Sequence, residues 1–126
     1  MRIKESKLKG LYLIEPRVLQ DERGFFIEVF RHDTFKTHGL DISFVQIGHS
    51  YSRKNVLRGL HFQFDRPMGK FIRVISGRIF AVAADIRKKS ATFKDWLGLE
   101  LSAQNKMEVY IPPGVAFGFC VLGSGA

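Results

Sequence analysis

The chain has 126 residues, a formal net charge of +8 and a hydrophobic fraction of 45%. This length fits one domain spanning residues 1–126, and the apolar content supports a packed core, which excludes a disordered chain. A basic surface suits an anionic partner, either a nucleic acid or a small phosphorylated ligand. Because the basic residues form no block of about five like charges, we expect no nucleic-acid partner.

The chain contains a single cysteine, Cys120, in an apolar stretch. It cannot form an intrachain disulfide, and a buried thiol of this kind is typical of a reducing compartment. The first residues do not read as a signal peptide, and no apolar stretch approaches the roughly 20 residues that span a bilayer. We therefore expect a cytoplasmic protein with no membrane partner.

The first third of the chain predicts short strands and one helix. Residues 11–19 are apolar but broken by Glu15-Pro16, which favours two short strands or an edge strand. The turn signal Asp21-Glu22-Arg23-Gly24 precedes a strand over residues 25–30. Residues 32–38 form the only helix candidate. Asp33 is placed to cap its start and Gly39 its end.

The rest of the chain predicts strands separated by glycine-containing turns. Phe occurs 12 times, and Ala-rich helical runs are absent, which favours β-structure. Ser76-Gly77-Arg78 predicts a tight hairpin between its two flanking strands. Many short strands at regular spacing predict an all-β sandwich or barrel rather than βαβ units. The expected strands cover residues 42–47, 56–62, 71–75, 79–86, 96–101, 109–111 and 115–122.

His61 is the titratable group with the clearest functional potential. Strand alternation places it on one face with Gly59 and Gln63, where it either lines a cavity or is an ordinary strand histidine. The same alternation sends Arg58 to the opposite face. A bulge at Gly59 would instead bring Arg58 and His61 to one site.

Three further segments carry groups suited to an anionic ligand. Lys70 opens a strand, where an ammonium either stabilises an oxyanion or is merely solvated. Arg23 lies in a turn beside Phe26, so its guanidinium either grips a phosphate while the ring stacks on a base, or faces solvent. Glu28 shares a strand face with Phe26.

Metal and nucleotide-cofactor motifs are missing from the sequence. The four histidines form no His-x-His pair, and no acid stands at a matching ligand interval. No glycine-rich phosphate loop of the P-loop or dinucleotide type occurs. We therefore expect neither a metal nor a cofactor.

Several segments in a fixed order resemble the dTDP-4-dehydrorhamnose 3,5-epimerase family. The resemblance extends over roughly residues 11–122, and its strength lies in the series rather than in one motif. The matching residues are Asp21 to Phe26, Phe44-Val45-Gln46, His49-Ser50, Ser52, Val56 to Gln63, Ala83 to Arg87, Ser90, Thr92-Phe93, Trp96, Leu101-Ser102-Ala103, Asn105 and Ile111 to Gly114.

The resemblance implies a cupin-type jelly-roll barrel without a metal, usually a homodimer. It implies epimerisation at C3 and C5 of a dTDP-linked 4-keto-6-deoxy sugar, as in dTDP-rhamnose biosynthesis. On matching positions, His61 is the general base and Lys70 the partner of the enolate oxygen. The positions matched to contacts with the nucleotide or sugar are Arg23, Phe26, Glu28, Gln46, Arg58 and Gln63. In such proteins the N-terminal strands reach the neighbouring subunit, so Arg23 and Glu28 are expected to act across the dimer.

The chain also departs from the family pattern. Ile47-Gly48, Ala81 and Phe117 stand where the family usually has Asp-Asn, Asp and His. Family members continue beyond the position of Ala126, and that part carries a tyrosine acid and an acidic residue that orients the base. Besides an active epimerase, two readings therefore stay open. One is a homologue that binds a nucleotide sugar without turnover, and the other is a mono-epimerase or 3,4-ketoisomerase.

Overall fold

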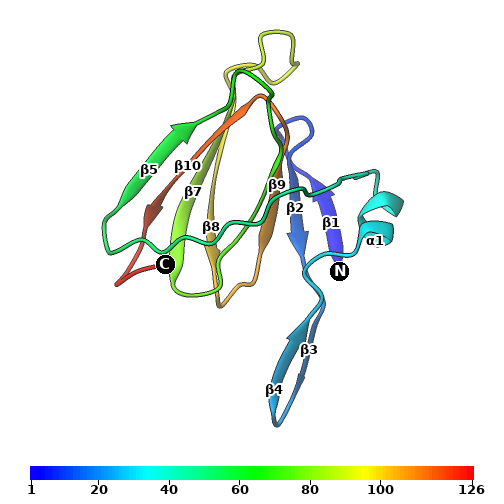
Figure 1. Cartoon of the computed structure of the whole chain (residues 1–126), viewed down its shortest axis with the longest axis vertical. Helices are drawn as coiled ribbons and strands as arrows, with labels where there is room; N and C mark the ends of the chain where they lie inside the picture. The colour runs from blue at the N-terminus through cyan, green and yellow to red at the C-terminus, as the bar shows by residue number, and fades with distance from the viewer.

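The structure is a computed structural model that describes all residues, 1–126, and consists almost entirely of strands (Figure 1). Two four-stranded sheets and a separate two-stranded hairpin contain ten strands, and six residues form one helix. The first sheet has the order β1 (Arg2–Glu5), β2 (Tyr12–Glu15), β9 (Glu108–Ile111) and β6 (Lys70–Arg73). The second has the order β5 (Leu57–His61), β10 (Val115–Val121), β7 (Arg78–Asp85) and β8 (Trp96–Ser102). The hairpin pairs β3 (Val18–Asp21) with β4 (Gly24–Ile27), and helix α1 covers His32–Thr37.

The main core lies between the two sheets. On β7 every second residue is buried, from Ile79 to Asp85, as period-2 alternation requires for a strand with one face inward. Side chains from both sheets form one apolar cluster, with Val109 and Ile111 from the first and Ala81, Leu101 and Phe117 from the second. Two facing antiparallel sheets around one core make the jelly-roll barrel that the sequence predicted.

Helix α1 closes a second, smaller core on the outer face of the first sheet. Phe35 of the helix is fully buried together with Ile14 of β2 and Leu40. The Phe35 ring meets the Phe71 ring edge-on, with 5.8 Å between centroids. No helix in the structure has the length and apolar character needed to cross a bilayer.

Most predicted elements are confirmed, and the exceptions have physical causes. The helix ends with Gly39 at a φ of +83°, but its N-cap is Arg31 and Asp33 makes no cap bond. The predicted strand over residues 42–47 is wrong, because this segment pairs with no other strand. The Ser76-Gly77-Arg78 turn exists, but it joins β6 and β7, which belong to different sheets and form no hairpin.

The outer face of the first sheet buries one carboxyl group. Glu108 is 1% exposed, lies opposite Ile14 and Arg73 in the register, and its Oε1 is 3.8 Å from the Arg73 Nε. Its Oε2 has no hydrogen-bond partner. Burial raises the pKa of this carboxyl to about 7, against a smaller opposing effect of Arg73. The folded state therefore holds the Glu108 proton more tightly than the unfolded chain does.

This linkage predicts that stability is highest below the unfolded pKa of 4.5 and falls as pH rises towards about 7. The interval between these values corresponds to roughly 3 kcal/mol. Glu108→Gln removes the cost of ionisation, so at about pH 8 the variant should exceed the parent in unfolding free energy by up to that amount, with little gain at about pH 5. Urea unfolding at both pH values measures this. The exposed Glu100→Gln is the control, and an equal gain at both pH values for Glu108→Gln would contradict the linkage.

Candidate active site

The pairing of β5 with β10 contains an irregularity at the candidate base. His61 lies opposite Phe117 and Arg58 lies opposite Phe119, so two residues of β5, Gly59 and Leu60, face the single residue Gly118. This count of two residues against one is a β-bulge. The bulge that the sequence offered as one of two possibilities at Gly59 is therefore present.

Two glycines allow the backbones of β5 and β10 to approach at this bulge. A Cβ on Gly59 would lie 2.5 Å from the Gly118 Cα, and a Cβ on Gly118 would lie 2.7 Å from the Arg58 carbonyl oxygen. Gly59 also has a φ of +116°, which side chains other than hydrogen rarely tolerate. Sequence reasoning missed Gly118, although its place between Phe117 and Phe119, two inward aromatic residues, is a signal of close backbone contact.

The bulge puts Arg58 and His61 on the same face of β5. Directly paired residues share a sheet face, and Phe117 and Phe119 both pack towards the main core. Simple alternation, which sends Arg58 and His61 to opposite faces, is therefore wrong here. Because β5 is the edge strand of its sheet, both side chains also remain open to solvent.

Lys70 approaches the same place from the other sheet. It pairs with Ile111 of β9, a core residue, so its side chain shares the inward face of β6. The Lys70 Nζ donates a hydrogen bond to the backbone carbonyl of His61, at 3.4 Å. Burial lowers the pKa of this half-buried ammonium. Lys70 thus contacts the backbone of His61, and the side chains of His61 and Arg58 share the inward face of β5.

The residues paired with His61 and Arg58 across the sheet are apolar. Phe117 faces His61 across β5 and β10, and Ala83 follows it on β7. Two residues further along β10, Phe119 pairs with Arg58 of β5 on one side and with Ala81 of β7 on the other. Ala81 and Phe117 are both buried in the main core. These two positions, at which the resemblance led us to expect polar side chains, therefore hold buried apolar ones.

Three other candidate residues lie on a separate arm of the molecule. Arg23, Phe26 and Glu28 belong to the β3–β4 hairpin and the residues after it, and Figure 1 shows this hairpin projecting away from both sheets. Within the arm, the Arg23 Nη2 pairs with the Asp21 Oδ2 at 2.6 Å, and Glu28 pairs with Arg31. The Phe26 ring is 63% exposed. A single chain does not bring these residues to His61.

The two glutamine candidates lie in exposed segments outside the strands. Gln46 is in the unpaired stretch between α1 and β5, and Gln63 follows the end of β5. The structure shows no hydrogen bond from either side chain. No group of three or more His, Cys, Asp or Glu side chains gathers as a metal site.

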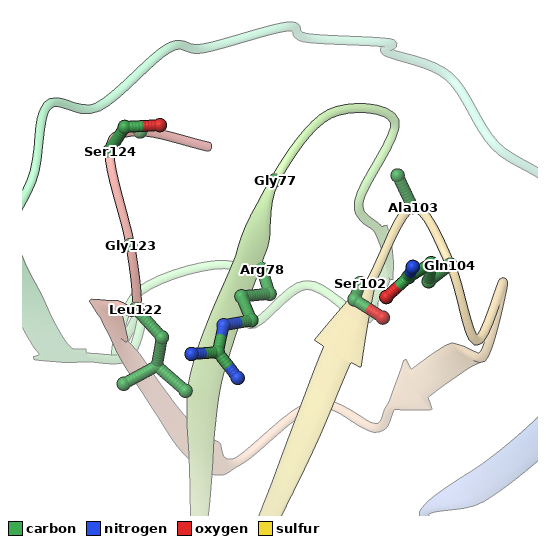
Figure 2. Close-up of a pocket in the computed structure, with 9 residues that line it drawn as sticks. Gly77, Arg78, Ser102, Ala103, Gln104, Leu122, Gly123 and Ser124 are labelled. Carbon is green, nitrogen blue, oxygen red and sulfur yellow. The ribbon is translucent and has the colours of Figure 1, made fainter.

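A cavity of about 320 Å³ lies at the other end of the second sheet. Figure 2 shows it between the end of β8, the start of β7 and the residues after β10, with the Arg78 guanidinium, Ser102 and Gln104 at its wall. Its lining contains no histidine, cysteine or carboxylate. The region of His61, Arg58 and Lys70 is therefore a better candidate for an active site than this cavity.

Comparisons with known proteins agree on one family. The family model for dTDP-4-dehydrorhamnose 3,5-epimerase matches residues 5–126. The dTDP-4-dehydrorhamnose 3,5-epimerase of Neisseria gonorrhoeae is 49% identical over 126 residues, which are 100% of this chain and 38% of that protein. That of Methanothermobacter thermautotrophicus is 49% identical over 121 residues, 96% of this chain and 65% of that protein.

Solved structures give the same result. The dTDP-6-deoxy-D-glucose-3,5-epimerase of Legionella pneumophila, in complex with dTDP-4-keto-L-rhamnose, is similar at a TM-score of 0.93 and 43% identity. The match covers 98% of this chain and 66% of that chain. The chain thus spans less than two thirds of the length of each of these three proteins.

The glycine contact between β5 and β10 predicts a position-specific effect. Gly118→Ala places a methyl group 2.7 Å from the Arg58 carbonyl oxygen, so β5 must move away or the barrel must strain. We expect a loss of unfolding free energy of about 2–3 kcal/mol, in the range of overpacked cores. Chemical denaturation measures it. Gly48→Ala is the control because a Cβ there meets nothing within 4 Å. Equal stability of the two variants would contradict the contact.

Proposed function

Because the chain belongs to the dTDP-4-dehydrorhamnose 3,5-epimerase family, we propose that it epimerises C3 and C5 of a dTDP-linked 4-keto-6-deoxy sugar, as in dTDP-rhamnose biosynthesis. The observation that carries the proposal is the bulge that turns Arg58 and His61 to one face beside Lys70. These three groups supply a base, an oxyanion partner and a phosphate ligand.

The chemistry follows from the acidity of protons next to a ketone. His61 removes the proton from C3 or C5, the C–H electrons form a carbon–carbon double bond, and the carbonyl electrons move to the oxygen. The Lys70 ammonium stabilises the resulting enolate, and its partial desolvation strengthens that interaction. A proton returned to the opposite face of the carbon restores the ketone with inverted configuration. The reaction is redox-neutral and moves only protons, so it requires no cofactor or metal.

The substrate class is supported by a relative with bound ligand. The Legionella pneumophila protein carries dTDP-4-keto-L-rhamnose, the kind of molecule that this reaction produces. In this chain Arg58 lies on the same strand as His61 and provides a planar guanidinium for a diphosphate oxygen. Gln46 and Gln63 provide neutral hydrogen-bonding groups for the sugar or base.

The projecting hairpin supports a homodimeric form of the site. Its residues Arg23, Phe26 and Glu28 cannot serve the His61 of their own chain, while the exposed Phe25 and Phe26 rings offer an apolar surface. We assign Arg23 to a phosphate and Phe26 to the face of the base in a second copy. Glu28 is assigned to the same ligand across the dimer. We assign the reaction to the cytoplasm, because the single free thiol, Cys120, suits a reducing compartment.

A second candidate function rests on the apolar groups around His61. Phe117 faces this histidine and Ala81 lies in the adjacent row, so neither offers a hydrogen bond to the imidazole or to a sugar hydroxyl. The His61 ring makes no hydrogen bond within the chain. This arrangement favours a protein that binds the nucleotide sugar through Arg58 and Lys70 but turns it over slowly or at one carbon only.

Deuterium exchange from solvent tests the epimerase directly. Incubation with a dTDP-4-keto-6-deoxy sugar in D₂O should replace the hydrogens at C3 and C5, as proton NMR shows. His61→Asn should lower the exchange rate by about 10²–10⁴-fold, the usual contribution of a general base. His38→Asn, an exposed histidine at the end of α1, is the matched control and should exchange at the parent rate.

The same experiment separates the two candidate functions. Exchange at one carbon only would indicate a mono-epimerase. Binding of dTDP by calorimetry without exchange at either carbon would support the second function and contradict the first. A folded protein that neither binds dTDP nor exchanges hydrogen would overturn both.

A further inference from the structure

A basic surface at the loop end of the barrel takes no part in the site described above. We call it the basic tip and define it by five exposed lysines on the β1–β2 turn and the β7–β8 loop, together with the exposed apolar residues around them. The lysines are Lys7, Lys9, Lys88, Lys89 and Lys94, and the apolar residues are Ile86, Phe93 and Trp96.

One buried carboxylate accepts hydrogen bonds from several residues of the β7–β8 loop in the basic tip. Asp85, at the end of β7, is fully buried and accepts hydrogen bonds from the Arg87 guanidinium at 2.8 and 2.7 Å and from the Ser90 and Thr92 hydroxyls at 2.6 and 2.7 Å. These bonds hold the pKa of Asp85 far below its usual range.

The same network joins the two segments of the tip. The Arg87 Nη2 donates to the Lys9 carbonyl at 2.6 Å, and the Lys9 amide donates to the Thr92 hydroxyl at 3.2 Å. Hydrogen bonds therefore connect the two segments that bear the five lysines.

The charge of the tip is only partly compensated. Glu5 pairs with Lys9 at 3.2 Å, and Asp95 is the other acid on these segments. Arg87 and Asp85 neutralise each other inside. The tip thus carries five lysines and two carboxylates, a net charge of +3 out of the +8 of the whole chain.

Aromatic rings stand among these charges. The indole of Trp96 is 58% exposed, with the Lys7 Nζ 5.9 Å from its centroid, and the Lys94 Nζ lies 5.5 Å from the Phe93 centroid. An exposed indole and phenyl beside flexible ammonium groups is a combination that suits the interface between water and lipid. There the rings enter the headgroup layer while the lysines reach its phosphates.

The shape of the tip favours a membrane over a nucleic acid as its partner. Proteins that track a nucleic acid strand use a basic groove, whereas the β7–β8 loop is the outermost projection at its end of the molecule (Figure 1). A projecting surface matches a flat bilayer. We propose that the basic tip binds anionic lipid bilayers peripherally. The sequence analysis expected no membrane partner because no apolar stretch is long enough to span a bilayer. Binding to the membrane surface does not require such a stretch.

The single tryptophan of the chain makes the contact directly measurable, because Trp96 lies in the tip. The full chain should sediment with vesicles containing about one third phosphatidylglycerol, and its Trp96 emission should shift to the blue. Vesicles of phosphatidylcholine alone, or inorganic phosphate at matched concentration, should leave the emission unchanged. Raising salt from about 0.1 M to about 0.5 M should release the protein, since screening shortens the range of the attraction.

Charge-reversal variants locate the surface. Lys88→Glu with Lys89→Glu should weaken vesicle binding at least about 25-fold, because each lysine near an anionic surface contributes about fivefold. The matched control is Arg53→Glu with Lys54→Glu, an exposed adjacent pair ahead of β5, at the end of the barrel where β10 finishes. It should change binding much less. Phe93→Ser keeps the charge and should weaken binding about fivefold through lost apolar contact.

Three outcomes would overturn the proposal when circular dichroism shows folded protein. The first is no sedimentation with anionic vesicles. The second is an equal loss of binding in both charge-reversal pairs, which would indicate attraction by net charge alone. The third is retention on single-stranded or duplex DNA that depends on Lys88 and Lys89, with no vesicle binding.

Discussion

The backbone of β5 can lie against β10 only because both strands have a glycine at the point of contact. A Cβ on Gly59 would lie 2.5 Å from the Cα of Gly118, which is too close. A Cβ on Gly118 would lie 2.7 Å from the carbonyl oxygen of Arg58. The close approach accommodates an extra residue in β5, and that residue changes which side chains turn inward. Without it, either Arg58 or His61 would point away from the barrel. The composition of the candidate site thus depends on two residues that carry no functional group.

The strands were predictable from the sequence wherever a local pattern decides them. Alternation and turn residues predicted β5 to β10 within a residue or two. Most of these strands have one face against the core, whereas β5 is a largely exposed edge strand. Strand β1, with the sequence Arg-Ile-Lys-Glu, was missed because Ile3 is its only apolar residue. Residues 42–47 have a strand-like sequence, yet Val45 is 99% exposed because no neighbour pairs with this segment. Strand β7 joins the second sheet because it pairs with β8 and β10. The local sequence of the Ser76–Arg78 turn carries no information about these pairings.

The candidate site was predictable only in part for the same reason. The family resemblance proposed His61 and Lys70, and the structure brings the Lys70 ammonium to the His61 carbonyl. Alternation could not decide the face of Arg58, because the answer depends on Gly118, a residue distant in sequence. Arg23, Phe26 and Glu28 were proposed for the same site, but in one chain they lie on an arm directed away from it. Their placement at a site is a property of an assembly rather than of local sequence.

Binding and proton transfer make different demands on this barrel. A partly desolvated ammonium such as Lys70 gains most from an anion, whether a phosphate oxygen or an enolate, because water no longer solvates it fully. Ala81 and Phe117 carry no charge, so they do not oppose the attraction between Lys70 and an anion. A base at the position of His61 has a different requirement, because neither Ala81 nor Phe117 can accept a hydrogen bond from its ring. Within one chain, the proposed anion-binding group Lys70 is therefore better supported by its contacts than the histidine proposed as the base.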